Sequence, residues 1–148
     1  MNRSDIRVKA YAVFRRGREI LVNEVRESDG TLSGFRIPGG HVEFGERAFD
    51  AVQRELMEEF GAEAENYQFL PMMENLYVYN GKPGHEVVFS YTADFKDKSF
   101  YERETIEAFE DNGQAFTLFW LDPANCPAGT EIFPAGIAGI LALQHLTK

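Results

Sequence analysis

Three closely spaced glutamates, Glu55, Glu58 and Glu59, are the residues of this chain best suited to chemistry. On an α-helix, residues three and four apart share one face, so the three carboxylates would lie side by side. A hard divalent cation such as Mg²⁺ or Mn²⁺ relieves the repulsion between them. Such a cation neutralises phosphate oxygens and acidifies a bound water, whose proton a spare carboxylate could accept. The same spacing is also typical of a solvated helix face.

Residues 46–60 predict the helix that would hold these carboxylates. The segment has no proline or glycine, and Gly61 is placed to end it. A stripe of apolar side chains adjoins the carboxylate face and can dock on a sheet. The stripe consists of Phe49, Val52, Leu56 and Phe60. We therefore expect one face of the helix to carry chemistry and the adjoining face to join the core.

Two small side chains on the carboxylate side of the helix, Ala48 and Ala51, would let another segment approach closely. We expect that segment to be residues 38–40, Pro-Gly-Gly, which follow a short extended stretch at residues 35–37. Proline and two glycines predict a break in the strand there, with backbone carbonyls exposed by a turn.

The wider segment, residues 40–62 (GHVEFGERAFDAVQRELMEEFGA), gives the carboxylates a specific context. Its order is Gly, five residues, Glu, seven residues, Arg-Glu, an apolar residue, one residue, Glu-Glu, one residue, Gly and a small apolar residue. This order resembles the Nudix box at every position, which is far more specific than a lone glycine-rich pattern. Residues 35–39 and the order of strands extend the resemblance more loosely. Ala62 is smaller than the bulky aliphatic residue usual there, which we expect to affect packing only.

The resemblance implies an α/β fold, an α/β/α sandwich with a mixed β-sheet in which the box forms a catalytic loop-helix-loop. It implies that Mg²⁺ or Mn²⁺ supports hydrolysis of the pyrophosphate bond in a small substrate, a nucleoside diphosphate linked to another group X. The implied metal ligands are Glu55, Glu58 and Glu59, with the Gly39 carbonyl as a further ligand. One of these glutamates, or a nearby acid, would orient or deprotonate water.

Arg54 and Glu46 belong to the same motif, and the resemblance implies that they orient the catalytic carboxylates. They would do so by charge-assisted hydrogen bonds. The alternative for Arg54 is a surface ion pair with Asp50 or Glu58, one helical turn away on either side.

Members of the resembled family often take an additional acid from a later segment. Glu107, Glu110 and Asp111 precede the predicted strand 115–121, and we prefer Glu110 as the further metal ligand. A solvated surface charge is the alternative for each of them.

Several residues outside the carboxylate set are candidates for binding the substrate. They are Gly40, Arg26, Arg36, Phe35 and Glu86. The two arginines could grip phosphate or be solvated. Phe35 could stack on a base, although core packing is the stronger interpretation. His85, next to Glu86, is interpreted as a surface or capping histidine rather than a base.

Composition limits the partners of the chain. Its 148 residues suit one domain spanning residues 1–148, and its net charge of −9 makes long nucleic acids poor partners. A small anionic ligand remains suitable if a cation screens it. Cys126 is the single cysteine, so no internal disulfide forms. Residues 1–5 lack the apolar run of a signal peptide, and no stretch is long enough for a membrane span, so we expect a cytoplasmic protein. A homodimer is left open.

Outside the box, apolar and alternating segments predict the sheet. Strands are predicted at residues 8–15, 19–25, 68–79, 86–95 and 115–121. We expect a loop at residues 28–34 and a turn at residues 80–84. Pro134 is expected to open a final helix that ends near Leu146.

Two other functions remain to be weighed against hydrolysis. A catalytically silent nucleotide sensor or scaffold could share the resembled fold, but such modules usually lose one of the box acids, and none is lost here. An isomerase of prenyl diphosphates also shares that fold, but it would need an added catalytic cysteine and glutamate in a longer chain. Cys126 lies in an expected loop far from the box.

Overall fold

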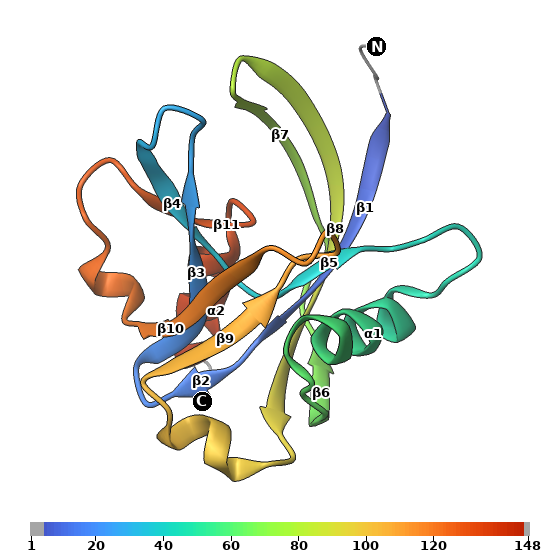
Figure 1. Ribbon diagram of the computed structural model, residues 1–148, viewed down its shortest axis with the longest axis vertical. Coiled ribbons are helices and arrows are strands. Elements are labelled where there is room, and N and C mark those ends of the chain that lie inside the picture. Colours follow the sequence, from blue (N-terminus) through green and yellow to red (C-terminus); the bar gives the residue numbers. More distant parts are fainter. Residues whose placement is uncertain (1–4, 147–148) are drawn as a thin grey trace.

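The computed structural model describes residues 5–146 as two mixed sheets with helices packed against them (Figure 1). The first sheet has the strand order β5-β1-β8-β6, and β7 also pairs with β8. Its only parallel pair within the described residues is β1 with β8. Its strands are β1 (Ile6–Val13), β5 (Gly39–His41), β6 (Ala64–Phe69), β7 (Met73–Tyr79) and β8 (Lys82–Phe95).

The second sheet has the order β11-β4-β3-β10-β9, and β2 also pairs with β3. Here β11 runs parallel to β4, and the other pairs of described strands are antiparallel. The strands are β2 (Arg15–Arg16), β3 (Glu19–Arg26), β4 (Leu32–Arg36), β9 (Thr105–Phe109), β10 (Ala115–Leu121) and β11 (Glu131–Phe133).

The two α-helices pack into separate parts of the core. Helix α1 (Ala48–Phe60) contributes to a cluster with β1, β8, β9 and β10, whereas α2 (Ile137–Leu146) contributes to a second cluster with β1, β3, β4 and β11. Two short 3₁₀ helices, η1 (Lys98–Glu102) and η2 (Pro123–Asn125), connect strands. The predicted α/β sandwich with mixed sheets and a loop-helix-loop is confirmed. Within the described residues, no helix has the length and apolar character needed to cross a membrane.

Helix α1 follows the predicted pattern closely. It begins at Ala48, two residues later than predicted, because the chain is still extended at Arg47. Gly61 ends it in the left-handed conformation, with φ of 66°; its N–H donates to the Met57 carbonyl, and the Ala62 N–H donates to the Leu56 carbonyl. Val52 and Leu56 are fully buried, but Phe49 at the edge of the stripe is 44% exposed.

Several predicted strand boundaries were wrong. The stretch 68–79 is two strands, β6 and β7, separated around Pro71, and the turn at 80–84 is shorter because β8 already begins at Lys82. The loop at 28–34 ends early, since β4 starts at Leu32. Residues 38–40 do not form a simple turn, because β5 pairs with β1 from Gly39 onward. The C-terminal helix begins at Ile137, whose N–H bonds the Pro134 carbonyl.

Strands β9 and β11 were not predicted at all. β9 lies between charged segments, and the three residues of β11 are too few to show a period. Residues 1–4, for which no signal peptide is expected, lie outside the described residues.

Replacing Leu56 with alanine should destabilise the fold. The fully buried side chain would leave a cavity, and such changes lower the free energy of unfolding by roughly 2–5 kcal/mol. Met57→Ala is the matched control, because Met57 is 48% exposed on the same helix, and it should change stability by no more than about 0.5 kcal/mol. Urea unfolding measures both variants. Equal losses would contradict the assignment of the Leu56 face to the core.

Candidate functional site

Carboxylates from two parts of the chain converge on one face of α1. Oxygen atoms of Glu55, Glu58 and Asp111 all lie within 4.8 Å of one another. Glu55 and Glu58 come from α1, and Asp111 comes from the turn between β9 and β10. Glu59 lies on the same helix face and is 6% exposed, whereas Glu58 is exposed to solvent. The arrangement is an all-oxygen donor set of the kind that hard divalent cations bind.

Burial makes two of these carboxylates costly to ionise. The pKa of Glu59 is raised to about 8, mainly by desolvation and then by the neighbouring Glu55 charge, while the Arg36 charge opposes the rise. Desolvation also raises the pKa of Glu55, although the Arg54 guanidinium opposes this shift. A bound cation would favour the ionised form of both side chains. The chemistry of this donor set therefore fits Mg²⁺ or Mn²⁺.

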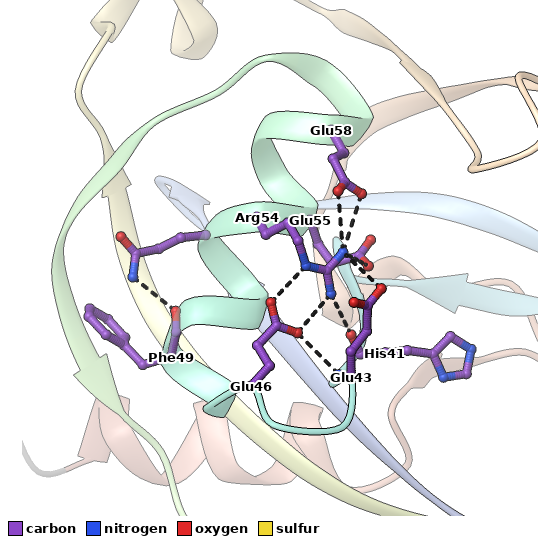
Figure 2. A network of polar contacts seen from close by, with 8 residues as sticks. His41, Glu43, Glu46, Phe49, Arg54, Glu55 and Glu58 are labelled. Atoms are coloured by element: carbon purple, nitrogen blue, oxygen red, sulfur yellow. Dashed lines mark hydrogen bonds and ion pairs between the residues drawn. The ribbon is translucent and has the colours of Figure 1, made fainter.

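Arg54 organises the carboxylates through a network of short hydrogen bonds (Figure 2). Its Nε donates to Glu46 at 2.7 Å, and its Nη2 donates to Glu46 at 3.0 Å and to the His41 carbonyl at 2.9 Å. Its Nη1 donates to Glu55 at 3.0 Å and to Glu58 at 3.2 Å. The bond with Arg54 lowers the pKa of Glu46. The ion pair with Glu58, which was the alternative role for Arg54, is thus one part of a larger network that also fixes buried Glu55.

Two glycines let β5 pass between β1 and α1. A Cβ atom at Gly40 would lie 2.6 Å from the carboxyl carbon of Glu55, so only hydrogen fits beneath that carboxylate. Gly39 has φ of 147°, and a Cβ there would overlap the Ala10 carbonyl and Tyr11. On the helix side, Ala51 is fully buried, in keeping with the expected close approach. The strand thereby brings the backbone of residues 39–41 against the carboxylates.

The structure favours a different acid outside the box from the one we preferred. Asp111 joins the carboxylate cluster, whereas Glu110 lies 3.9 Å from Arg36. The reason is the tight turn after β9, where Glu110 exchanges backbone hydrogen bonds with Gly113 and Gln114 and sends consecutive side chains in different directions. Glu107 is exposed on β9 and is not part of the cluster.

The two arginines proposed for substrate binding differ in their surroundings. Arg36 lies on β4, and its buried Nε–H has no hydrogen-bond partner within the described part of the chain. The side chain as a whole is 31% exposed, so another part of the guanidinium can reach a phosphate oxygen. Arg26 instead donates to Glu24 at 3.1 Å and to the Gly30 carbonyl at 2.9 Å, so its guanidinium is already engaged.

The other three substrate candidates are less open to a ligand. Phe35 is 4% exposed and packs edge-on against Phe119, as core packing predicts, so it offers little surface for stacking. Glu86 is buried, lies 3.5 Å from Lys9 Nζ and accepts a hydrogen bond from the Tyr77 hydroxyl. Gly40 has no side chain, and this leaves the space that the Glu55 carboxylate occupies. His85 lies 3.2 Å from Glu74, in keeping with a surface role.

Sequence reasoning missed two polar residues on the strands around the site. Lys9 is partly buried on β1, with 11% of its side chain exposed, and Asn23 is 7% exposed on β3. Each interrupts an alternating or apolar strand, which is the signal that could have identified them, because buried polar groups need a partner.

The site combines acidic side chains on α1, an arginine that holds them in place (Arg54) and a second arginine nearby (Arg36). Such a combination suits hydrolysis of a phosphoanhydride with the help of a divalent cation. A family model, that of the NUDIX domain, matches residues 5–133. The chain therefore belongs to the Nudix family, and it is a Nudix hydrolase.

Several solved structures share the fold of this chain. The chain is similar to a MutT Nudix hydrolase from Burkholderia pseudomallei, with 23% identity, a TM-score of 0.65 and coverage of 93% of this chain and 98% of the other. It is also similar to the E. coli ORF135 protein, with 23% identity, a TM-score of 0.63 and coverage of 97% and 91%. A Nudix hydrolase from Nitrosomonas europaea has 15% identity, a TM-score of 0.63 and the same coverage.

Adding one methyl group at Gly40 should disturb catalysis more than folding. The new Cβ would displace the Glu55 carboxylate, so kcat should fall about tenfold or more, as misplaced groups do elsewhere. The free energy of unfolding should fall by no more than roughly 1–3 kcal/mol. Gly139→Ala in α2 is the control, because no atom lies within 4 Å of its Cβ position. A fully active Gly40→Ala enzyme would contradict the contact.

Metal binding should distinguish the three acids near β9. Asp111→Asn should weaken Mg²⁺ binding by about 10–100-fold, whereas Glu107→Gln should not change it. A cation that binds only the folded state raises Tm, so the affinity for Mg²⁺ can be followed through the rise in Tm with Mg²⁺ concentration. An unchanged Mg²⁺ response in Asp111→Asn, with a loss in Glu110→Gln, would restore Glu110 as the ligand.

Proposed function

We propose that this Nudix hydrolase cleaves the pyrophosphate bond of a small substrate in which a nucleoside diphosphate is linked to another group. The observation that carries the proposal is the convergence of oxygen atoms from Glu55, Glu58 and Asp111 within 4.8 Å, next to buried Glu59. These four side chains would hold Mg²⁺ or Mn²⁺. The bound cation supplies charge neutralisation of the phosphates and a more acidic water.

The chain's own residues would prepare the site in three ways. Arg54 holds the Glu55 and Glu58 carboxylates in place, and Glu46 in turn fixes Arg54. Arg36, whose side chain is 31% exposed, would donate a guanidinium N–H to a phosphate oxygen, which would align the pyrophosphate with the carboxylates. A carboxylate of the set that is not engaged by the cation would accept the proton of the attacking water. The Gly39 carbonyl, at the start of β5, remains a proposed further ligand.

A catalytically silent nucleotide sensor is the second candidate function. The complete set of carboxylates and the hydrogen bonds that Arg54 makes to them disfavour this function, because a protein that only binds nucleotides does not need them. An isomerase of prenyl diphosphates is disfavoured by the position of Cys126, which packs against the core cluster that contains α2 rather than beside the carboxylates.

Hydrolysis should depend strictly on the cation and on Glu58. With nucleoside diphosphate-linked substrates, EDTA should abolish release of products, and excess Mg²⁺ or Mn²⁺ should restore it. Glu58→Gln should lower kcat by about a hundredfold or more without unfolding the protein, as loss of a preorganised charge does in other enzymes. Glu102→Gln, an exposed glutamate on η1, is the control and should be fully active.

Chromatographic identification of the products would show which phosphoanhydride bond is cut. Metal-independent hydrolysis would exclude the proposed chemistry. Tight nucleotide binding without any turnover would instead support the sensor.

A further inference from the structure

Strand β7 lies at an edge of the first sheet and lacks the features that usually protect an edge strand. It pairs with β8 and with no other strand in the described part of the chain. Edge strands commonly carry lysine, proline or a bulge, which keep another strand from adding to them. β7 (MENLYVY) has none of these, and its single charge is that of Glu74. By contrast β6, on the same side of β8, has a register shift between Glu65 and Gln68.

The turn that joins β7 to β8 determines which backbone groups of β7 face outward. Asn80 and Gly81 both have positive φ, 52° and 75°, as in a two-residue type I′ turn. The residues that flank such a turn, here Tyr79 and Lys82, exchange backbone hydrogen bonds, and the pattern alternates along the two strands. Every second residue over 74–78 therefore directs its N–H and C=O groups away from β8. Among the described strands, none accepts or donates there.

The side chains of these outward-facing residues lie on an exposed apolar face of the sheet. Leu76 is 75% exposed and Val78 is 72% exposed. Ile6 on β1 extends the face, since Ile6 and Leu76 are both Cα partners of His85, and it is 58% exposed. Further along the sheet, α1 packs on the same face, but the helix does not reach this end (Figure 1). Both the backbone and the side chains of β7 are thus available to a partner.

The hairpin of β7 and β8 is also held in place from its other face. The Tyr79 hydroxyl donates to the Arg26 carbonyl at 2.6 Å, and Asn80 Oδ1 accepts from the Ser28 N–H at 3.1 Å. These bonds tie the end of the hairpin to β3 and to the loop after it. A strand that is already ordered loses little conformational freedom when it pairs with another.

We propose that β7 pairs with β7 of a second copy of this chain, antiparallel and about a two-fold axis at Leu76. A two-fold axis pairs one surface with itself. The register centred on Leu76 pairs all seven residues of β7 and brings the outward-facing groups together, which gives about six backbone hydrogen bonds. Glu74 then lies opposite Val78 of the second copy. The two Glu74 carboxylates are therefore far apart, by roughly four residues of extended chain, and do not repel each other strongly.

The extent of this contact sets the expected strength of the dimer. One strand and its neighbouring apolar side chains form an interface at the small end of the usual range, which is typical of weak association. We expect a dissociation constant in the micromolar range. The dimer is independent of the proposed hydrolysis, because β7 contributes none of the carboxylates of the site.

Lysine substitutions at two positions on the exposed face test the register. Analytical ultracentrifugation measures the dissociation constant of the dimer, and circular dichroism checks the fold. Leu76→Lys places two lysines opposite each other and should raise the constant about tenfold or more. Val78→Lys, matched in exposure, places lysine opposite Glu74 of the second copy and should change it by less than about threefold. A wild-type protein that stays monomeric throughout the micromolar range would overturn the proposal, and the edge would then suit a peptide of another protein.

Cysteine substitutions at the same two positions test the axis. Opposite residues of a hydrogen-bonded antiparallel pair have Cα atoms about 5.5 Å apart, which is within reach of a disulfide. With a mild oxidant, Leu76→Cys should form a cross-linked dimer, whereas Val78→Cys, about 14 Å from its counterpart, should not. Wild type, which has Cys126, gives the background. Equal cross-linking of the two variants, or a dimer that Leu76→Lys does not weaken, would overturn the pairing through β7.

Discussion

The burial of carboxylates on a helix that also packs into the core is the constraint on which the rest of this structure depends. Glu55 and Leu56 are adjacent in sequence, yet one must reach a ligand while the other must exclude water. Arg54 makes the combination possible, because its guanidinium bonds Glu46, Glu55 and Glu58 at once. A planar guanidinium presents several donors in fixed directions, which lysine cannot do. Without the hydrogen bond from Arg54, the ionised Glu55 carboxylate would be buried with no opposite charge beside it.

The backbone beside α1 also depends on the burial of these carboxylates. The Glu55 carboxylate occupies the space where a side chain at residue 40 would lie, and β1 occupies the space beside residue 39. Glycine at both positions lets β5 run in the narrow gap between strand and helix. A pair of glycines after a proline predicts a turn from local propensity alone, but here the tertiary contact decides the outcome.

The sequence predicted the helix, its end at Gly61, the two helix faces and the mixed sandwich, because these follow from local spacing and from the motif. It did not predict β9, β11 or the split at Pro71, which depend on pairing with distant strands. Nor could it choose between Glu110 and Asp111. Two adjacent acids in a turn differ only in the directions of their side chains, and those directions are set by backbone hydrogen bonds within the turn.

Several polar side chains are buried in the core of this fold, on α1 and in both sheets. Within the described residues, the buried polar or charged side chains are Asn23, Glu55, Glu59, Glu86 and Ser90. Arg36 adds a buried N–H without a partner, and its charge acts on Glu59. Each unpaired buried group lowers stability by about 1–3 kcal/mol. A fold selected for stability alone would replace such groups with apolar ones. For Glu55 and Glu59 the burial is best explained by a ligand, because a bound cation would stabilise both ionised carboxylates.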